Sequence, residues 1–131
     1  VETFGELETL QFIEKAKNDT NLLLVDSRTE NWFFHETIPG AVNVPYVYLK
    51  QSQYPDEFEE YLAILGVKKV NGKYDFTNAK ELLMFCNGAW CGQSPESMKY
   101  LIEIGYPESK LKWYRGGIQS WLSLGLTTVK P

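Results

Sequence analysis

Two cysteines, Cys86 and Cys91, are the residues of this 131-residue chain best suited to covalent chemistry. Both lie in the segment CNGAWCGQS, residues 86–94. An apolar run precedes this segment and a helix-start pattern ends it, so we predict a loop between a strand and a helix. Its two glycines allow tight curvature and close approach of the backbone to a ligand. Successive N–H groups of such a loop, turned inward, form a cradle for an anion.

The chemistry that this loop favours is a nucleophilic thiolate at Cys86. The amide cradle and the positive end of the following helix both stabilise negative charge, so they favour thiolate over thiol. The thiolate attacks the outer sulfur of a donor and keeps it as a persulfide until a second nucleophile accepts it. The alternative is a buried cysteine that only packs as a small apolar residue. We predict that Cys86 is catalytic and that the rest of the loop binds substrate: Asn87, Gly88, Ala89, Trp90, Cys91, Gly92, Gln93 and Ser94.

Three roles are open for Cys91. It is a resolving thiol that forms a disulfide with Cys86 after oxidation, a second sulfur carrier, or a residue that packs beside Trp90. Four residues separate the two cysteines, so the segment lacks the two-residue spacing of thioredoxin-like sites.

The elements that must position this loop alternate between strands and helices. Apolar runs over Leu22–Val25 and Leu82–Phe85 predict strands buried on both faces, followed directly by Asp26 and Cys86. This alternation predicts an α/β fold: a mainly parallel sheet flanked by helices on both faces, in a single domain over residues 1–131. Ligand sites in such folds lie beyond the carboxyl ends of strands, where Cys86 falls. Further strands are expected at Ala41–Val44 and Leu111–Tyr114, a hairpin turn at Asn71-Gly72, and helices over 5–17, Glu30–His35 and Asp56–Leu65.

Two more helices are predicted, one on each side of the last strand. Ser94-Pro95-Glu96 indicates a helix start with serine as the N-cap, and Gly116-Gly117 opens the final helix. The expected buried faces are Leu7, Leu10, Ile13 and Ala16 in the first helix, Met98, Leu101 and Ile102 after the cysteine loop, and Ile118, Trp121 and Leu122 in the last helix.

The two arginines of the chain, Arg28 and Arg115, are expected to support the site. In the structural interpretation, which we favour, Arg28 pairs with Asp26 or Glu30 and Arg115 ties a loop. In the functional interpretation, either arginine extends toward the sulfur and supplies positive charge. Asp26, at a strand end, is expected to accept hydrogen bonds from nearby backbone, with a general base as the alternative.

Composition limits the partners. A net charge of -4 argues against nucleic acid, because phosphate binding requires a basic face. No apolar run approaches the roughly 20 residues of a membrane span. Two cysteines and the lone His35 do not make a four-ligand zinc site, so no metal is expected. No cofactor is expected either. Localisation is unknown; the start at Val1 and the cysteine pair favour a periplasmic bacterial domain slightly over a cytoplasmic one.

Two segments around the loop resemble signatures of the rhodanese family. Asp26-Ser27-Arg28 followed by Ile38–Pro45 is similar to the first signature, and Tyr114–Trp121 is similar to the closing one. Between them, Cys86 follows the strand where the family's catalytic cysteine belongs. The resemblance spans residues 5–126. It implies the rhodanese α/β fold with a sulfurtransferase-type active-site loop.

This loop departs from the usual family pattern in two ways. The common loop has about six residues from the cysteine to the helix-capping serine or threonine, whereas Ser94 lies eight positions beyond Cys86. The common loop also carries basic residues, and this one has none. Activity on thiosulfate is therefore left open.

The function predicted on this basis is an enzyme, a rhodanese-like sulfurtransferase or persulfide carrier. It takes sulfane sulfur onto Cys86 from a small sulfur donor or a protein persulfide. It passes the sulfur to a thiophilic acceptor, for which another protein is one option. The alternatives are a non-catalytic interaction module and a thiol redox sensor that uses Cys86 and Cys91. A cysteine phosphatase is disfavoured, because Gly92 stands where that chemistry requires an arginine.

Overall fold

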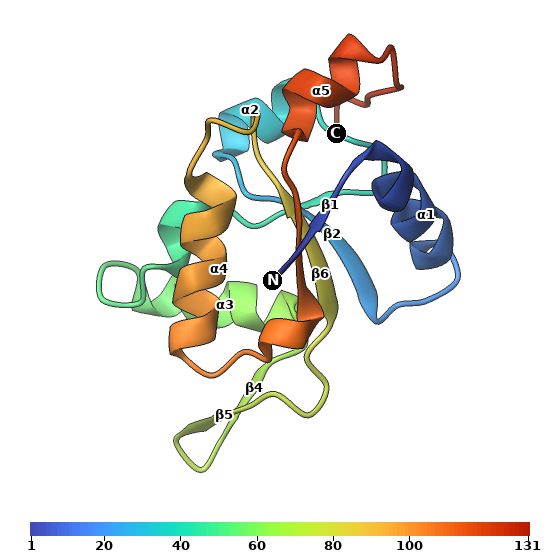
Figure 1. Cartoon of the computed structure of the whole chain (residues 1–131). Coiled ribbons are helices and arrows are strands. Elements are labelled where there is room, and N and C mark those ends of the chain that lie inside the picture. The colour runs from blue at the N-terminus through green and yellow to red at the C-terminus, as the bar shows by residue number, and fades with distance from the viewer.

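A parallel sheet of five strands, in the order β1-β7-β6-β2-β3, forms the centre of the computed structural model, which describes all 131 residues (Figure 1). Every neighbouring pair in this sheet is parallel. The strands are β1 (Glu2–Phe4), β2 (Leu22–Asp26), β3 (Val42–Asn43), β6 (Glu81–Phe85) and β7 (Leu111–Tyr114).

Helices cover both faces of the sheet, with α1 on one side and α3 and α4 on the other. The α/β fold with a mainly parallel sheet is therefore confirmed. A separate antiparallel hairpin projects from the lower end in Figure 1, and its turn at Asn71 and Gly72 has the positive φ angles, 52° and 77°, of a tight hairpin turn. The helices are α1 (Glu6–Ala16), α2 (Glu30–His35), α3 (Pro55–Ile64), α4 (Gln93–Glu103) and α5 (Gly117–Ser123); the hairpin strands are β4 (Lys68–Val70) and β5 (Lys73–Asp75); short 3-10 helices span Tyr46–Leu49 and Glu108–Lys110.

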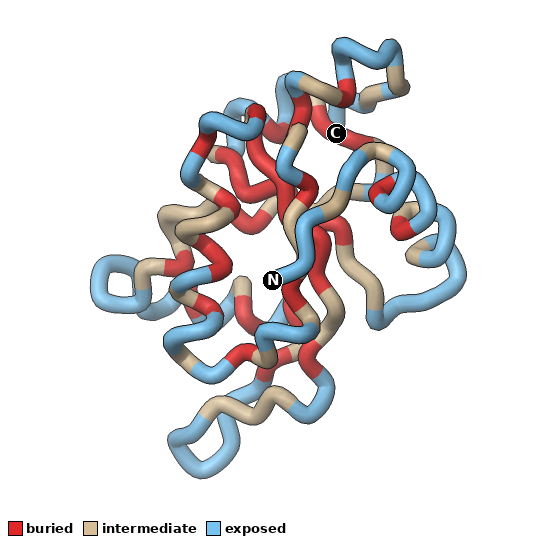
Figure 2. The backbone as a smooth tube through the Cα atoms, in the orientation of Figure 1, coloured by how far each residue is buried: buried red, intermediate tan, exposed pale blue.

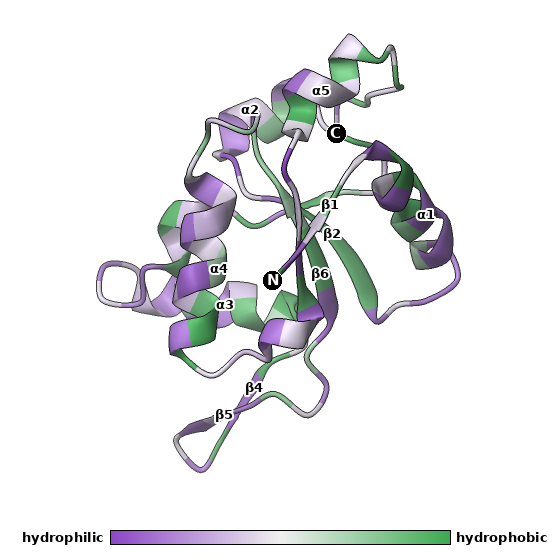
Figure 3. Cartoon of the chain, in the orientation of Figure 1, coloured by the Kyte–Doolittle hydropathy of each residue, from purple (hydrophilic) through white to green (hydrophobic).

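The central strands read as continuous apolar runs because each of their faces packs into its own core. In β2, Val25 belongs to one hydrophobic cluster and Leu24 to the other; in β6, Leu82 and Leu83 divide in the same way. Figure 2 shows β6 as a buried line through the middle of the molecule, and Figure 3 shows the same strand as hydrophobic. Burial of both faces is what a helix-covered parallel sheet requires.

The prediction of which residues are buried is partly wrong for three helices. Helix α1 buries Thr9 and Phe12, whereas Leu7 and Leu10 are exposed. Thr9 can be buried because its hydroxyl donates to the Gly5 carbonyl at 2.8 Å, and Phe12 packs edge-to-face against Phe4. Two residues expected to be buried in later helices are exposed as well: Ile102 and Leu122.

Two buried tyrosines make the stability of this fold sensitive to alkali. Desolvation raises the pKa of Tyr106 above the ordinary value of 10.0. Desolvation and a hydrogen bond to Glu6 together raise the pKa of Tyr114 above the same value. Above that pH the unfolded chain loses these protons first, so the free energy of unfolding falls as pH rises. We expect urea midpoints to fall between about pH 9 and pH 11, and to fall less in Tyr106→Phe. If the urea midpoint falls with pH equally steeply in Tyr106→Phe and in the wild type, Tyr106 does not contribute to the loss of stability.

Candidate active site

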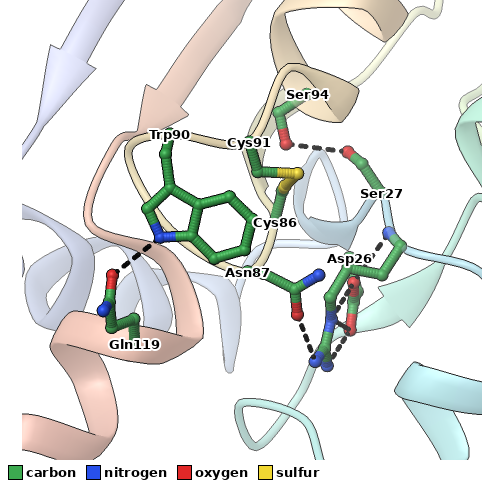
Figure 4. Close-up of a disulfide and its surroundings, with 9 residues drawn as sticks. Asp26, Ser27, Cys86, Asn87, Trp90, Cys91, Ser94 and Gln119 are labelled. Carbon is green, nitrogen blue, oxygen red and sulfur yellow. Dashed lines mark hydrogen bonds and ion pairs between the residues drawn. A yellow bond between two sulfur atoms is a disulfide. The ribbon is translucent and has the colours of Figure 1, made fainter.

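Cys86 lies where the sequence predicted it, directly after β6, the middle strand of the sheet. The loop runs from there to Gly92, and α4 begins at Gln93. Both cysteines are buried, with Cys86 2% and Cys91 8% exposed. Asp26 ends the neighbouring strand β2, so the two strand ends bring Asp26 and Cys86 to the same edge of the sheet (Figure 4).

The two cysteines are joined in a disulfide. A turn brings them together, in which the Cys91 N–H donates to the Gly88 carbonyl at 3.1 Å. A sulfur in a disulfide is not a nucleophile, so the thiolate chemistry expected at Cys86 requires that this bond first be reduced.

The start of α5 anchors the other side of the loop. The N–H groups of Ile118 and Gln119 donate to the carbonyls of Cys86 and Asn87 at 3.0 and 2.8 Å. Trp90 is 71% exposed, and its ring nitrogen donates to the Gln119 side chain at 3.0 Å. Helix α5 therefore holds the loop at its first two residues and at Trp90, whose indole is largely exposed to solvent.

Several backbone amides of the loop make no hydrogen bond within the chain: those of Asn87, Gly88, Ala89, Trp90 and Gly92. Gly88 is buried and Asn87 is partly buried, whereas Ala89, Trp90 and Gly92 are exposed, so the amides of these three can also bond to solvent. Unpaired donors in the loop that carries Cys86 are suited to an anionic ligand. This supply of donors is what the predicted cradle requires.

Helix α4 starts earlier than the sequence suggested. Gly92 is its N-cap, and the Gly92 carbonyl accepts the N–H of Glu96 at 2.9 Å. The prediction of Ser94 as the N-cap is wrong: Ser94 is in the first turn, fully buried, and its hydroxyl donates to that of Ser27 at 3.0 Å. Pro95 is tolerated in the first turn because the N–H groups there have no intrahelical partner. The positive end of the helix therefore lies close to Cys91.

A buried ion pair links β2 to the loop. Arg28 is 1% exposed, and its Nη2 and Nε donate to the Asp26 carboxylate at 2.7 and 3.0 Å. Thr37 adds a hydrogen bond to the same carboxylate at 2.9 Å. Arg28 therefore pairs with Asp26 and not with Glu30. The carboxylate is committed to these contacts, which disfavours the alternative of a general base.

The free edge of the Arg28 guanidinium reaches the cysteine loop. Its Nη1 donates to the side-chain oxygen of Asn87 at 3.3 Å. Arginine can only donate, so it fixes which end of the Asn87 amide faces it, and the amide nitrogen is left as a donor without a partner in the chain. A neutral hydrogen-bond donor thus stands next to Cys86 in a loop that has no cationic side chain. Sequence reasoning did not identify this contact, because its partners are 59 positions apart.

The other arginine behaves differently. Arg115 is exposed, and its side chain makes no hydrogen bond or ion pair within the chain. The expectation that it ties a loop is not met. It lies between β7 and α5, the helix whose first amides hold the cysteine loop.

No group of three or more His, Cys, Asp or Glu side chains is placed to hold a metal ion. None of the helices has the length and apolar character that a membrane span requires.

Gly117 shapes the site through its missing side chain. Its φ is 61°, and an added Cβ would lie 2.3 Å from the Cys86 carbonyl oxygen and 2.9 Å from the Gly88 nitrogen. We expect Gly117→Ala to displace the loop, lower the free energy of unfolding by about 1–3 kcal/mol and slow sulfur loading of Cys86. Gly125→Ala is a matched control, because Gly125 also has a positive φ, 72°, but no atom within 4 Å of the added Cβ.

Equal loading rates in the two glycine variants, measured by mass spectrometry of the reduced proteins, would show that the contact with Cys86 does not matter. Unfolding by urea separates the cost of the backbone angle, which both variants share, from the cost of the clash, which only Gly117→Ala has.

These features define an α/β domain with a cysteine site at the carboxyl edge of a parallel sheet. A family model described as a rhodanese-like domain matches residues 9–124, so the chain belongs to the rhodanese-like domain family. A "Thiosulfate:glutathione sulfurtransferase" of Saccharomyces cerevisiae is 31% identical over 114 residues, which cover 84% of this chain and 71% of that protein.

Solved structures agree with the assignment of the fold. An uncharacterized protein from Saccharomyces cerevisiae, 27% identical, has a TM-score of 0.67 and covers 95% of this chain and 93% of its own. A human single-domain sulfurtransferase, 21% identical, has a TM-score of 0.62 over 94% of this chain and 96% of its own. A rhodanese-related protein from Thermoplasma volcanium, 16% identical, has a TM-score of 0.65 over the whole of both chains.

Proposed function

We propose that this chain is a sulfurtransferase or persulfide carrier that takes sulfane sulfur onto Cys86 and passes it to a thiophilic acceptor. The observation that carries the proposal is the position of Cys86. Cys86 follows the middle strand of the sheet and begins the loop that leads to α4. Several backbone amides of this loop have no acceptor within the chain. Membership of the rhodanese-like family and the name of the yeast relative support the same chemistry.

The catalytic cycle begins with the reduced protein. The thiolate of Cys86 attacks the sulfane sulfur of the donor, and the donor leaves with the electron pair of the broken bond. The resulting persulfide is anionic, and the unpaired amides of the loop and the Asn87 side-chain nitrogen are the donors available to it. An acceptor thiolate or cyanide then takes the outer sulfur and restores the Cys86 thiolate.

The electrostatics of the loop bear on the choice of donor. Residues 86–94 carry no charged side chain, and Arg28, whose guanidinium contacts Asn87, is neutralised by Asp26. A dianion such as thiosulfate therefore gains little attraction from side chains here. We expect donors of lower charge, or persulfides carried on another protein, to load Cys86 faster than thiosulfate.

The test is to reduce the protein, remove the reductant and add thiosulfate, inorganic polysulfide or a protein persulfide. Peptide mass spectrometry is expected to find one added sulfur on Cys86 in Cys91→Ser, where no disulfide can form, and none on the remaining thiol in Cys86→Ser. Absence of the adduct in Cys91→Ser with all three donors contradicts the proposal.

The disulfide favours a second candidate, a thiol redox sensor in which oxidation of Cys86 and Cys91 is itself the signal. The two functions differ in what the reduced protein does. A sensor forms the disulfide with peroxide and takes up no sulfur from the three donors, whereas a sulfurtransferase is loaded by at least one of them.

A further inference from the structure

We propose that the domain also reduces its own persulfide: Cys91 attacks the Cys86 sulfur, releases the outer sulfur as hydrosulfide and leaves the Cys86–Cys91 disulfide. This inference rests on the proposed loading of sulfur at Cys86. It assigns Cys91 the role of an internal acceptor, and it adds a reductive, sulfide-releasing activity to sulfur transfer.

The disulfide carries this inference, because it shows that the Cys91 sulfur reaches bonding contact with the Cys86 sulfur. That atom is the inner sulfur of the persulfide. Attack there, and not on the outer sulfur, is the reaction that the geometry of the loop permits directly. Hydrosulfide is a weaker base than a cysteine thiolate, so it is also a good leaving group in such an exchange.

The surroundings favour an internal acceptor over an external one. Both cysteines are nearly buried, and the hydrogen bond from the Cys91 N–H to Gly88 holds the two ends of the turn together. A thiol held in place reacts at an effective concentration far above that of a free thiol in solution. An external anionic acceptor also finds no cationic side chain in residues 86–94.

The step balances without any added reagent. The bond between the Cys86 sulfur and the outer sulfur breaks, and its electron pair leaves with the outer sulfur. A bond forms between the sulfurs of Cys91 and Cys86, and the proton of the Cys91 thiol ends on the outer sulfur, which leaves as hydrosulfide. The sulfane sulfur is reduced to sulfide while the two cysteines are oxidised to the disulfide. A low-molecular-weight thiol or dithiol then reduces the disulfide for the next cycle.

The experiment follows one turnover. The wild type and Cys91→Ser are reduced, freed of reductant, exposed to thiosulfate and desalted quickly. Inorganic polysulfide, and then a protein persulfide, replaces thiosulfate if thiosulfate does not load Cys91→Ser. We expect the wild type to release one hydrosulfide for each disulfide formed, counted by a sulfide probe and by thiol titration. Cys91→Ser is expected to keep its sulfur on Cys86 and to release hydrosulfide at least about 10-fold more slowly.

Two results overturn the inference while the proposed function stands: release from Cys91→Ser at the wild-type rate, or an added sulfur found on Cys91, which makes that residue a relay. Failure of Cys91→Ser to load with thiosulfate, with inorganic polysulfide and with a protein persulfide removes both proposals, so the two failures are distinguishable. Cys91→Ala serves as a second variant, and its melting temperature shows whether any change reflects misfolding.

Discussion

Cys86→Ser is expected to reduce sulfur transfer from a sulfane donor to cyanide by at least about 10³-fold, because the proposed persulfide has no other atom on which to form. A serine hydroxyl at this position is neither ionised near neutral pH nor able to hold sulfane sulfur. Thiocyanate formation by the reduced protein measures the rate. The fold is expected to persist, since serine and cysteine have nearly the same size.

Cys91→Ser gives the informative comparison. With Cys91 absent, Cys86 cannot be held in the disulfide, so this variant is expected to form thiocyanate without prior reduction, whereas the wild type requires it. Transfer by Cys86→Ser at a rate near that of the wild type would mean that sulfur is carried elsewhere in the chain. Transfer by the unreduced wild type at the rate of the reduced protein would mean that the disulfide does not control Cys86.

Arg28→Ala is expected to lower the free energy of unfolding by about 3–5 kcal/mol, because it leaves the fully buried Asp26 carboxylate without its cation. The Thr37 hydroxyl and the Arg28 backbone N–H remain as hydrogen-bond partners of that carboxylate, but neither supplies charge. Urea unfolding followed by circular dichroism measures the loss. Arg28→Lys is expected to lie in between, because lysine keeps the charge without the planar fork of donors.

The chain provides its own control for this prediction, since Arg115 is its other arginine. Arg115 is exposed and makes no ion pair, so Arg115→Ala is expected to change stability by less than about 0.5 kcal/mol. Equal stability of the two alanine variants would contradict the importance of the buried pair. Because Arg28 also contacts Asn87, slower loading of Cys86 in Arg28→Lys would show that the guanidinium positions the loop as well as stabilising the fold.

Local sequence patterns determined the elements of this fold and the place of its cysteine. The apolar runs before Asp26 and Cys86 predicted β2 and β6, and the Asn71-Gly72 pair predicted the hairpin turn. The Asp26–Arg28 pair was also predictable, because its partners are two residues apart. Such features depend on burial, turn geometry and short-range contacts, all of which are encoded within a few residues. The short strand β1 was not foreseen, because three residues without an apolar run carry no signal of their own.

The contacts that shape the site were decided only by the tertiary structure. The carbonyl of Cys86 accepts from Ile118, and Gly117 must lack a side chain because that same carbonyl lies against it. Arg28 contacts Asn87, and Ser94 contacts Ser27, over 59 and 67 positions. The sequence left three roles open for Cys91, and its disulfide with Cys86 became visible only once the loop was folded. These contacts join residues from different elements, so they depend on how the strand ends and helix starts pack together, which no local pattern records.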